Sequence, residues 1–216
     1  MSADGVVLLH GLGRTSGSMR LLERRVARAG YRTLSIRYSS TTEPLLAIAK
    51  TLEPDVCRFA GTLDGRIHII THSLGGLVVR ALLTRQKPKN LGRVVMLAPP
   101  HGGSEWVDML ERSRLARRIL GPNSQYLLTQ RSADLERNLG DVDYELGIIA
   151  GDRPIDFLIA PFLIRTPHDG KVSVASTRVA GMADHLTLPV GHPMMPFHPR
   201  VASQAIAFIK SGMFDR

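Results

Sequence analysis

Short apolar runs alternate with longer amphipathic segments along the whole chain. The apolar runs predict strands over residues 6–9, 33–38, 66–71, 93–98, 144–150 and 184–190. Between them, apolar residues spaced by three and four predict helices over residues 16–29 and 73–85, and a final helix buried through Val201, Ala205, Phe208 and Ile209. Residues 41–60 predict a helical region that Pro54 interrupts, and residues 105–140 predict several helical pieces.

This alternation predicts an α/β fold, in which about six mostly parallel strands carry helices on both faces. The 216 residues are expected to form one domain, since a chain of this length can enclose a sizeable core. In such a sheet the functional site lies beyond the carboxyl ends of the strands. The loops after residues 9, 71, 98, 151 and 190 are therefore expected to be neighbours in space.

Composition is ordinary for a globular domain, with 44% hydrophobic and 22% charged residues. The single cysteine, Cys57, excludes an intramolecular disulfide and favours a reducing compartment. No signal-like segment precedes the first strand, and no apolar run approaches the roughly 20 residues that span a bilayer. The expected location is the cytoplasm, with a secreted mature form as the alternative. Oligomeric state has no signature in the sequence.

The net charge of +9 is unevenly distributed. Residues 14–37 hold seven arginines against one acid, Glu23, and residues 80–93 hold five basic residues and no acid. Basic faces attract nucleic acid or anionic lipid. Arg20, Arg24 and Arg28 recur every four residues, however, as on the solvated side of a helix, and no aromatic residues or known motif accompany them. No nucleic-acid partner is predicted, while a transient lipid-surface contact stays open.

Ser73 lies between an apolar strand and a helix, as a serine nucleophile elbow requires. A tight turn there would strain the backbone and expose the hydroxyl. Gly75 and Gly76 would let the helix pass close to the strand, and its first N–H groups could stabilise an anion. The alternative is a serine that caps an ordinary helix. Thr71 stands where the usual Gly-x-Ser-x-Gly pattern has its first glycine.

A serine nucleophile needs a base, which in turn needs an orienting acid. His192 follows the last strand and is favoured as the base over His198, which adjoins the final helix.

For the acid, Asp169 between the last two strands completes the chain order Ser, Asp, His, and its alternative reading is an Asp-Gly turn. Asp152 and Asp156 remain possible acids, whereas Asp184 begins a strand at the opposite edge of the sheet.

A glycine-rich loop, His10-Gly11-Leu12-Gly13, follows the first strand. The N–H groups of Leu12 and Leu74 could together form an oxyanion hole, or the loop could be an ordinary strand-to-helix turn. The loop lacks the further glycine and the downstream acid of a dinucleotide site.

Taken in order, five motifs resemble the α/β-hydrolase superfamily, particularly small bacterial lipases and esterases. They are His10-Gly11, His72-Ser73-Leu74-Gly75-Gly76, Pro99-Pro100-His101-Gly102-Gly103-Ser104, Asp169-Gly170-Lys171-Val172 and His192. The resemblance implies Ser73 as nucleophile, Asp169 as acid, His192 as base and Leu12 and Leu74 as oxyanion donors. It also implies a minimal core, since the chain begins at what would be the family's third strand.

The other histidines have structural interpretations. His68 is expected to be a hydrogen-bonded core histidine, and His72 to orient the elbow rather than act as a base. His168 adjoins Asp169, but no His-x₃-His or cysteine pair accompanies them, so no metal site is predicted and the chemistry needs no cofactor.

Two segments could select the substrate, which is expected to be a small acyl ester or a lipid. Residues 105–140 occupy the place of a lid or cap, and residues 155–164 form an apolar run that could be an acyl-binding wall or simply core. The sequence thus predicts a carboxylic ester hydrolase. A thioesterase, amidase or acyltransferase with the same residues is an alternative, as is a catalytically silent binding protein.

Overall fold

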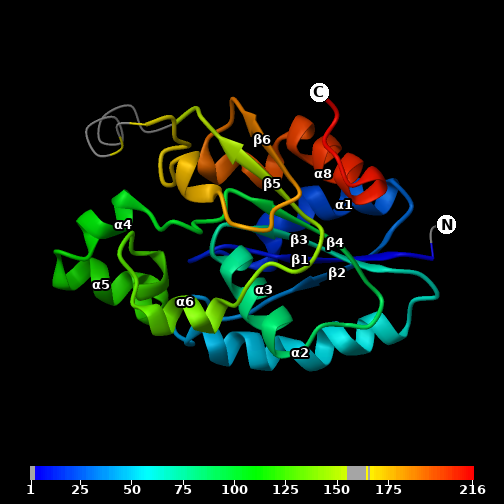
Figure 1. Cartoon of the computed structure of the whole chain (residues 1–216), viewed down its shortest axis with the longest axis horizontal. Helices are drawn as coiled ribbons and strands as arrows, with labels where there is room; N and C mark the ends of the chain where they lie inside the picture. The colour runs from blue at the N-terminus through cyan, green and yellow to red at the C-terminus, as the bar shows by residue number, and fades with distance from the viewer. Residues whose placement is uncertain (1–2, 155–163, 165) are drawn as a thin grey trace.

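The computed structural model describes residues 3–154, 164 and 166–216, and one parallel sheet runs through them (Figure 1). Its strands are β1 (Gly5–Leu9), β2 (Arg32–Ile36), β3 (Ile67–His72), β4 (Leu91–Leu97), β5 (Leu146–Gly151) and β6 (Asp184–Leu188). They lie in the order β2-β1-β3-β4-β5-β6, and every neighbouring pair is parallel. The predicted α/β fold with six strands is confirmed.

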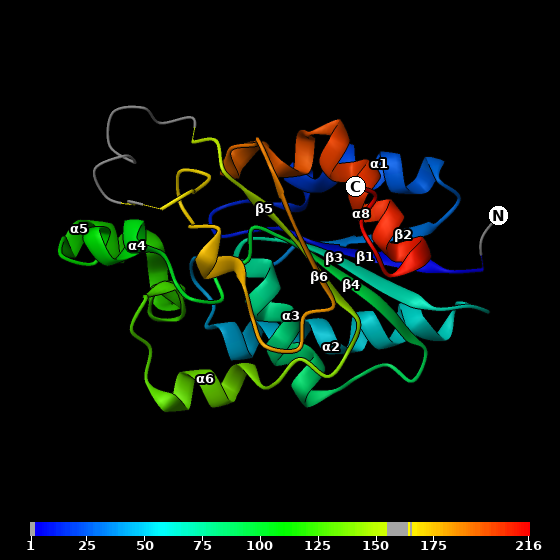
Figure 2. The ribbon, with the colours of Figure 1, turned by 45° about the horizontal axis from the view of Figure 1, so that its top comes forward.

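Helices cover both faces of this sheet, also as predicted (Figures 1 and 2). One face carries α1 (Arg20–Arg28), which a 3-10 turn at Ser16–Met19 precedes, and α8 (Pro199–Ser211). The other face carries α2 (Leu45–Gly61) and α3 (Leu74–Arg85), with α6 (Ala133–Leu139) packed against α3. No helix of the described ranges is long and apolar enough to cross a membrane.

Two hydrophobic cores follow from the two-residue period of each strand. In β1, Val7 and Leu9 pack with α2 and α3, whereas Val6 and Leu8 pack with α1 and α8. All four side chains are fully buried. A strand covered on both faces must be apolar at every position, which explains the continuous apolar runs in the sequence.

The predicted interruption at Pro54 is wrong, because α2 runs unbroken through it. Leu52 and Val56, on either side of the proline, are both buried against the sheet. Pro54 and Lys50 are exposed, so the carbonyl that loses its helical partner faces water. Apolar burial on the inner side therefore outweighs one missing hydrogen bond on the outer side.

Some predicted boundaries shift by a few residues. The strand expected to reach residue 38 ends at Ile36, and the Tyr38 N–H instead donates to His10 Nε2 at 3.4 Å. The last strand ends at Leu188, because the Val190 N–H turns back to the Leu188 carbonyl at 2.8 Å. In both cases the chain leaves the sheet at the edge where the candidate site lies.

Residues 105–140 form helical pieces, as predicted. They are α4 (Glu105–Leu110), α5 (Arg114–Leu120), a 3-10 segment (Gly121–Leu127) and α6. Buried Asn123 ties this region to the core, since its Nδ2 donates to the carbonyls of Ser40 and Glu43 at 2.7 and 2.8 Å. The predicted acyl-binding wall at residues 155–164, with the alternative acid Asp156, lies outside the described residues except for Ile164.

The basic residues at 80–93 do not form one continuous surface. Arg80 is buried and donates to the Gly140 carbonyl. Arg85 and Arg93 pair with glutamates on neighbouring elements, and Lys87 pairs with Asp143. Most of the charge in this segment is thus internal or neutralised.

Candidate active site

Ser73 occupies a strained turn between β3 and α3. Its φ of 53° and ψ of −125° lie in a region that side-chain-bearing residues rarely adopt. Its hydroxyl forms no capping bond with α3, so Ser73 is not the ordinary helix cap of the alternative interpretation. Ala98, after the adjacent strand β4, is the other non-glycine residue of the described chain with positive φ. Backbone strain therefore gathers at the carboxyl edge of the central strands.

Glycines let the loop after β1 pack directly on this turn. A Cβ on Gly75 would lie 2.7 Å from the His10 carbonyl oxygen, and one on Gly11 would lie 3.1 Å from Ser73 Cβ. Thr71, the departure from the usual elbow pattern, is fully buried, and its Oγ1 lies 3.4 Å from where a Gly76 Cβ would be. The elbow therefore accommodates threonine because the facing helical position has no side chain.

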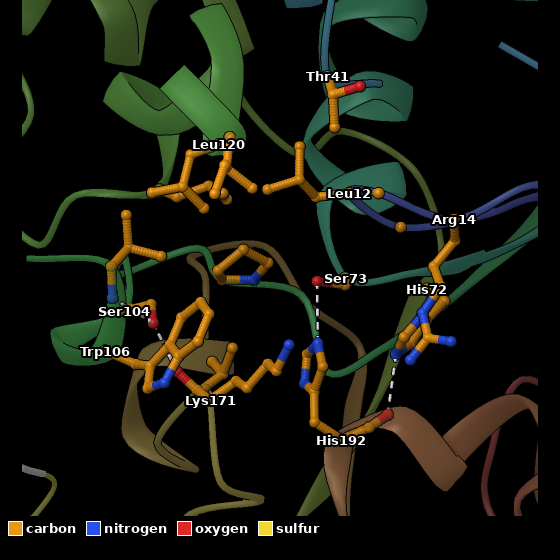
Figure 3. A pocket seen from close by; sticks show the side chains of 17 residues that line it. Leu12, Arg14, Thr41, His72, Ser73, Ser104, Trp106, Leu120, Lys171 and His192 are labelled. Atoms are coloured by element: carbon orange, nitrogen blue, oxygen red, sulfur yellow. Dashed lines mark hydrogen bonds between the residues drawn. The ribbon is translucent and has the colours of Figure 1, made fainter. Parts of the chain in front are cut away.

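His192 connects Ser73 with Asp169. Its Nε2 lies 3.0 Å from Ser73 Oγ (Figure 3). Its Nδ1 lies 2.7 Å from Asp169 Oδ2. A carboxylate only accepts hydrogen bonds, so Nδ1 carries the proton and Nε2 is free to accept from the serine hydroxyl. Both His192 and Asp169 are buried. Three loops far apart in sequence thus bring together the three residues that the sequence singled out.

Asp169 is held rigidly by its own turn. Its Oδ1 accepts the Lys171 and Val172 N–H groups at 3.0 and 2.9 Å, and its carbonyl accepts the His192 N–H at 2.9 Å. Two other candidate acids lie elsewhere. Asp152 is exposed, and Asp184, at the amino-terminal end of β6, accepts a hydrogen bond from the Phe214 N–H.

His72 holds the backbone of His192, since its Nε2 donates to the His192 carbonyl at 3.0 Å (Figure 3). Burial keeps the pKa of His72 well below the usual histidine value, so the ring is neutral and remains a fixed donor. His198 begins α8 instead of approaching Ser73. His68 accepts the Arg93 N–H at 2.9 Å inside the core, as expected.

His10 shapes the loop after β1. Its ring stacks on Tyr38 with centroids 4.0 Å apart, and its Nδ1 donates to the Gly11 carbonyl at 2.9 Å. Desolvation lowers the His10 pKa, which keeps this ring neutral too. Within the described chain no acceptor is bonded to the N–H of Leu12, nor to that of Leu74 at the start of α3. Both N–H groups are available to a developing anion.

A pocket of about 230 Å³ opens beside Ser73. Its apolar wall comes from Leu12, Trp106, Val107, Ile119, Leu120, Leu127 and Val172. In Figure 3, Leu12 and Leu120 lie on one side of Ser73, and Trp106 and Lys171 lie on the other. The Lys171 ammonium sits 4.6 Å from the centroid of the Trp106 ring.

Sequence reasoning did not assign Arg14, Thr41 and Lys171 to the pocket. Arg14 and Thr41 follow β1 and β2, so the rule that sites lie beyond strand ends could have indicated them. The contact between Lys171 and Trp106 has no local signal. Among the described residues, no group of three or more His, Cys, Asp or Glu side chains is placed to hold a metal ion.

Comparison with known proteins agrees with this architecture. A sequence model described as the alpha/beta hydrolase family matches residues 6–205. The chain belongs to this family. No curated protein matches it.

Three solved structures illustrate the likeness. Mature lipase BlEst2 of Bacillus licheniformis superposes with a TM-score of 0.77 at 17% identity, over 97% of this chain and 92% of that one. A metagenomic carboxyl esterase superposes with a TM-score of 0.75 at 18% identity, over 99% of this chain and 77% of that one. Phospholipase PlaB of Legionella pneumophila superposes with a TM-score of 0.72 at 18% identity, over 99% of this chain but only 60% of the phospholipase chain. At these identities the likeness shows the fold.

Proposed function

We propose that this member of the alpha/beta hydrolase family is a carboxylic ester hydrolase with Ser73 as nucleophile, His192 as base and Asp169 as orienting acid. The main support is the pair of contacts made by His192, 3.0 Å to Ser73 Oγ and 2.7 Å to Asp169 Oδ2. The strained turn at Ser73 adds to it, because the surrounding structure maintains that strain where the hydroxyl meets the pocket.

In the first half of the reaction, Ser73 Oγ attacks the ester carbonyl while His192 Nε2 takes the serine proton. Asp169 accepts the Nδ1 hydrogen bond and stabilises the imidazolium that forms. The tetrahedral oxyanion receives hydrogen bonds from the N–H groups of Leu12 and Leu74. The bond to the alcohol then breaks, and the alcohol leaves with the proton from His192.

Water repeats these steps on the acyl-enzyme. His192 removes a proton from water, the resulting hydroxide attacks the acyl carbonyl, and Ser73 regains the proton as the carboxylic acid departs. Every proton moves through His192, so its fixed position matters throughout. Both the Asp169 carbonyl and the His72 ring hold the backbone of His192 in place. The proposed chemistry requires no cofactor.

The pocket favours an apolar acyl group. Its volume of about 230 Å³ is below the roughly 300–1,000 Å³ of pockets for drug-sized ligands, which favours a short chain. Residues 105–140 provide Trp106, Val107, Ile119, Leu120 and Leu127 to its wall. We assign that segment as a cap over the acyl site, because it provides most of the apolar wall.

The test is hydrolysis of p-nitrophenyl acyl esters of increasing chain length. Ser73→Ala is expected to lower kcat by at least about 10⁴-fold, as loss of a triad nucleophile does. Ser203→Ala, an exposed serine on α8, is the matched control and should keep full activity.

Equal rates for Ser73→Ala and the parent protein would refute the proposal. If the protein hydrolyses thioesters or amides but not esters, the proposed substrate class changes from esters to thioesters or amides. A parent protein that neither hydrolyses any acyl substrate nor reacts with a fluorophosphonate would be a silent member of the family, contrary to the proposal.

A further inference from the structure

Helix α5 presents two large apolar side chains to solvent. Leu115 and Ile119 are four residues apart, so they lie on the same face, and they are 69% and 66% exposed. Among the described residues, only Met213 at 65% is comparably exposed among the large hydrophobics. Single exposed apolar residues are ordinary, whereas an adjacent pair on a peripheral helix indicates a surface that something covers.

Four arginines lie on or next to this helix. Arg112, Arg114, Arg117 and Arg118 are all exposed, and residues 112–133 contain no Asp or Glu. Over the part of the chain that the structure describes, none of the four is in an ion pair. In contrast, Arg85 and Arg93 elsewhere are neutralised by glutamates. Arg114 and Arg118 are four residues apart and adjoin Leu115, whereas Arg117 is two residues from both apolar side chains and lies on the other side of the helix. We refer to Leu115, Ile119, Arg112, Arg114 and Arg118 as the α5 face. Its charge indicates an anionic partner.

The α5 face adjoins the mouth of the active-site pocket. Ile119 is two-thirds exposed and also lines the pocket, so it lies on the rim. The next residue, Leu120, is buried and forms part of the wall beside Ser73 (Figure 3). Helix α5 itself projects at one end of the molecule with α4, away from α1 (Figures 1 and 2). Whatever covers this face lies where a substrate would enter.

Three possible partners fit poorly. A second copy of the chain would bring two arginine clusters together, and their like charges would repel. A stable protein interface buries about 800 Å² per partner, more than two apolar side chains on a two-turn helix provide. Nucleic acid would use aromatic side chains to stack bases, and residues 112–120 contain none. An amphipathic helix with apolar residues beside arginines is typical of a lipid interface.

We propose that the α5 face docks the protein on an anionic lipid surface. Leu115 and Ile119 enter the layer between the head groups, and Arg112, Arg114 and Arg118 contact lipid phosphates. The rim at Ile119 then opens the pocket toward the membrane. Docking does not require hydrolysis, so it goes beyond the proposed function and can be tested separately.

The experiment measures binding of the Ser73→Ala protein to sedimented vesicles, so that hydrolysis cannot alter the lipid. Vesicles of phosphatidylcholine with an equal amount of phosphatidylglycerol are compared with pure phosphatidylcholine, at low salt and at 0.5 M salt (about 4 Å screening). Binding is expected only to the anionic vesicles, and to weaken at high salt.

Two double variants address the α5 face. Replacing two arginines, Arg114→Gln with Arg118→Gln, should weaken binding about 30-fold, because each arginine near an anionic surface contributes about a fivefold factor. Replacing Leu115→Ser with Ile119→Ser should weaken it on the order of tenfold, since apolar burial is lost.

Matched controls lie outside this face. Arg20→Gln with Arg24→Gln removes the same charge from exposed positions of α1, and Met213→Ser removes an equally exposed apolar side chain. Both controls should bind within about twofold of the parent. The proposal is overturned if the α1 pair weakens binding as much as the α5 pair, or if neutral vesicles bind equally well.

Absence of binding to any vesicle would also overturn it, in favour of an acidic protein partner. If the protein with Ser73 intact binds the vesicles but hydrolyses no ester, the result contradicts the proposed function and leaves the docking proposal standing.

Discussion

The close approach of α3 to the end of β1 at Gly75 can be tested by adding one methyl group. In Gly75→Ala the new Cβ would lie 2.7 Å from the His10 carbonyl oxygen and 2.9 Å from that of Leu9. Distances below 3.0 Å require something to move. Both are backbone oxygens, that of Leu9 at the end of β1 and that of His10 in the loop just after it, so no side-chain rotation can relieve the contact.

The expected cost follows from overpacking, which typically destabilises a core by about 1–3 kcal/mol. Alanine also gains up to about 1 kcal/mol of helix propensity over glycine, which would mask part of this. Gly61→Ala is the matched control, because Gly61 is also helical and a Cβ there meets nothing within 4 Å. Since both variants share the propensity gain, the difference between them isolates the clash.

The assay is thermal and urea unfolding of both variants. A difference of about 1–3 kcal/mol corresponds to about 2–12 °C in Tm for a chain of this size, with Gly75→Ala the less stable. Ester hydrolysis by folded Gly75→Ala should also fall, because displacing the β1 loop moves the Leu12 N–H away from that of Leu74. Equal stability and equal activity for the two variants would refute the reasoning.

Two further predictions concern buried polar groups. Burial holds the pKa values of His72 and His101 well below the usual histidine value, so below about pH 6.5 the unfolded chain takes up protons that the folded chain excludes. The free energy of unfolding should therefore fall with decreasing pH, by up to about 1.4 kcal/mol per unit for each histidine. Urea unfolding midpoints at pH 8, 7, 6 and 5 measure this pH dependence, and a midpoint that does not change with pH would contradict the prediction. Asn123→Ala should destabilise the protein by about 1–3 kcal/mol and speed proteolysis within residues 105–140, because the Ser40 and Glu43 carbonyls lose their donor. Gln125→Ala removes an exposed amide of the same segment and should change neither quantity, so equal effects of the two changes would contradict the anchoring role of Asn123.

Much of the fold was predictable because its determinants are local. Strands such as β1 are buried on both faces, and this requirement appears in the sequence as a continuous apolar run. Helix α8 similarly appears as a stripe of residues at helical spacing. Pro54 shows the limit of local reasoning, since a proline usually ends a helix. There the packing of Leu52 and Val56 against the sheet decides the outcome.

The candidate site was predictable to the extent that it depends on chain order. Ser73, Asp169 and His192 follow strands in the expected order, and parallel strands bring their loops to one edge. Arg80, counted as surface charge from the sequence, turned out to be buried, because its partner Gly140 is 60 residues away. No pattern in the neighbourhood of Arg80 contains that information.

The sequence by itself determined the strand-and-helix alternation, the parallel sheet and the set of residues that meet at its carboxyl edge. All three features depend on the spacing of apolar and polar side chains along the chain and on the right-handed connection between parallel strands. Any chain with the same pattern of residues would have them. The tertiary structure alone decided that His192 reaches both Ser73 and Asp169, that Thr71 fits opposite Gly76, and that Leu115 and Ile119 remain exposed beside the pocket. Such contacts join segments up to 119 residues apart, and their distances follow from the packing of the whole sheet and its helices.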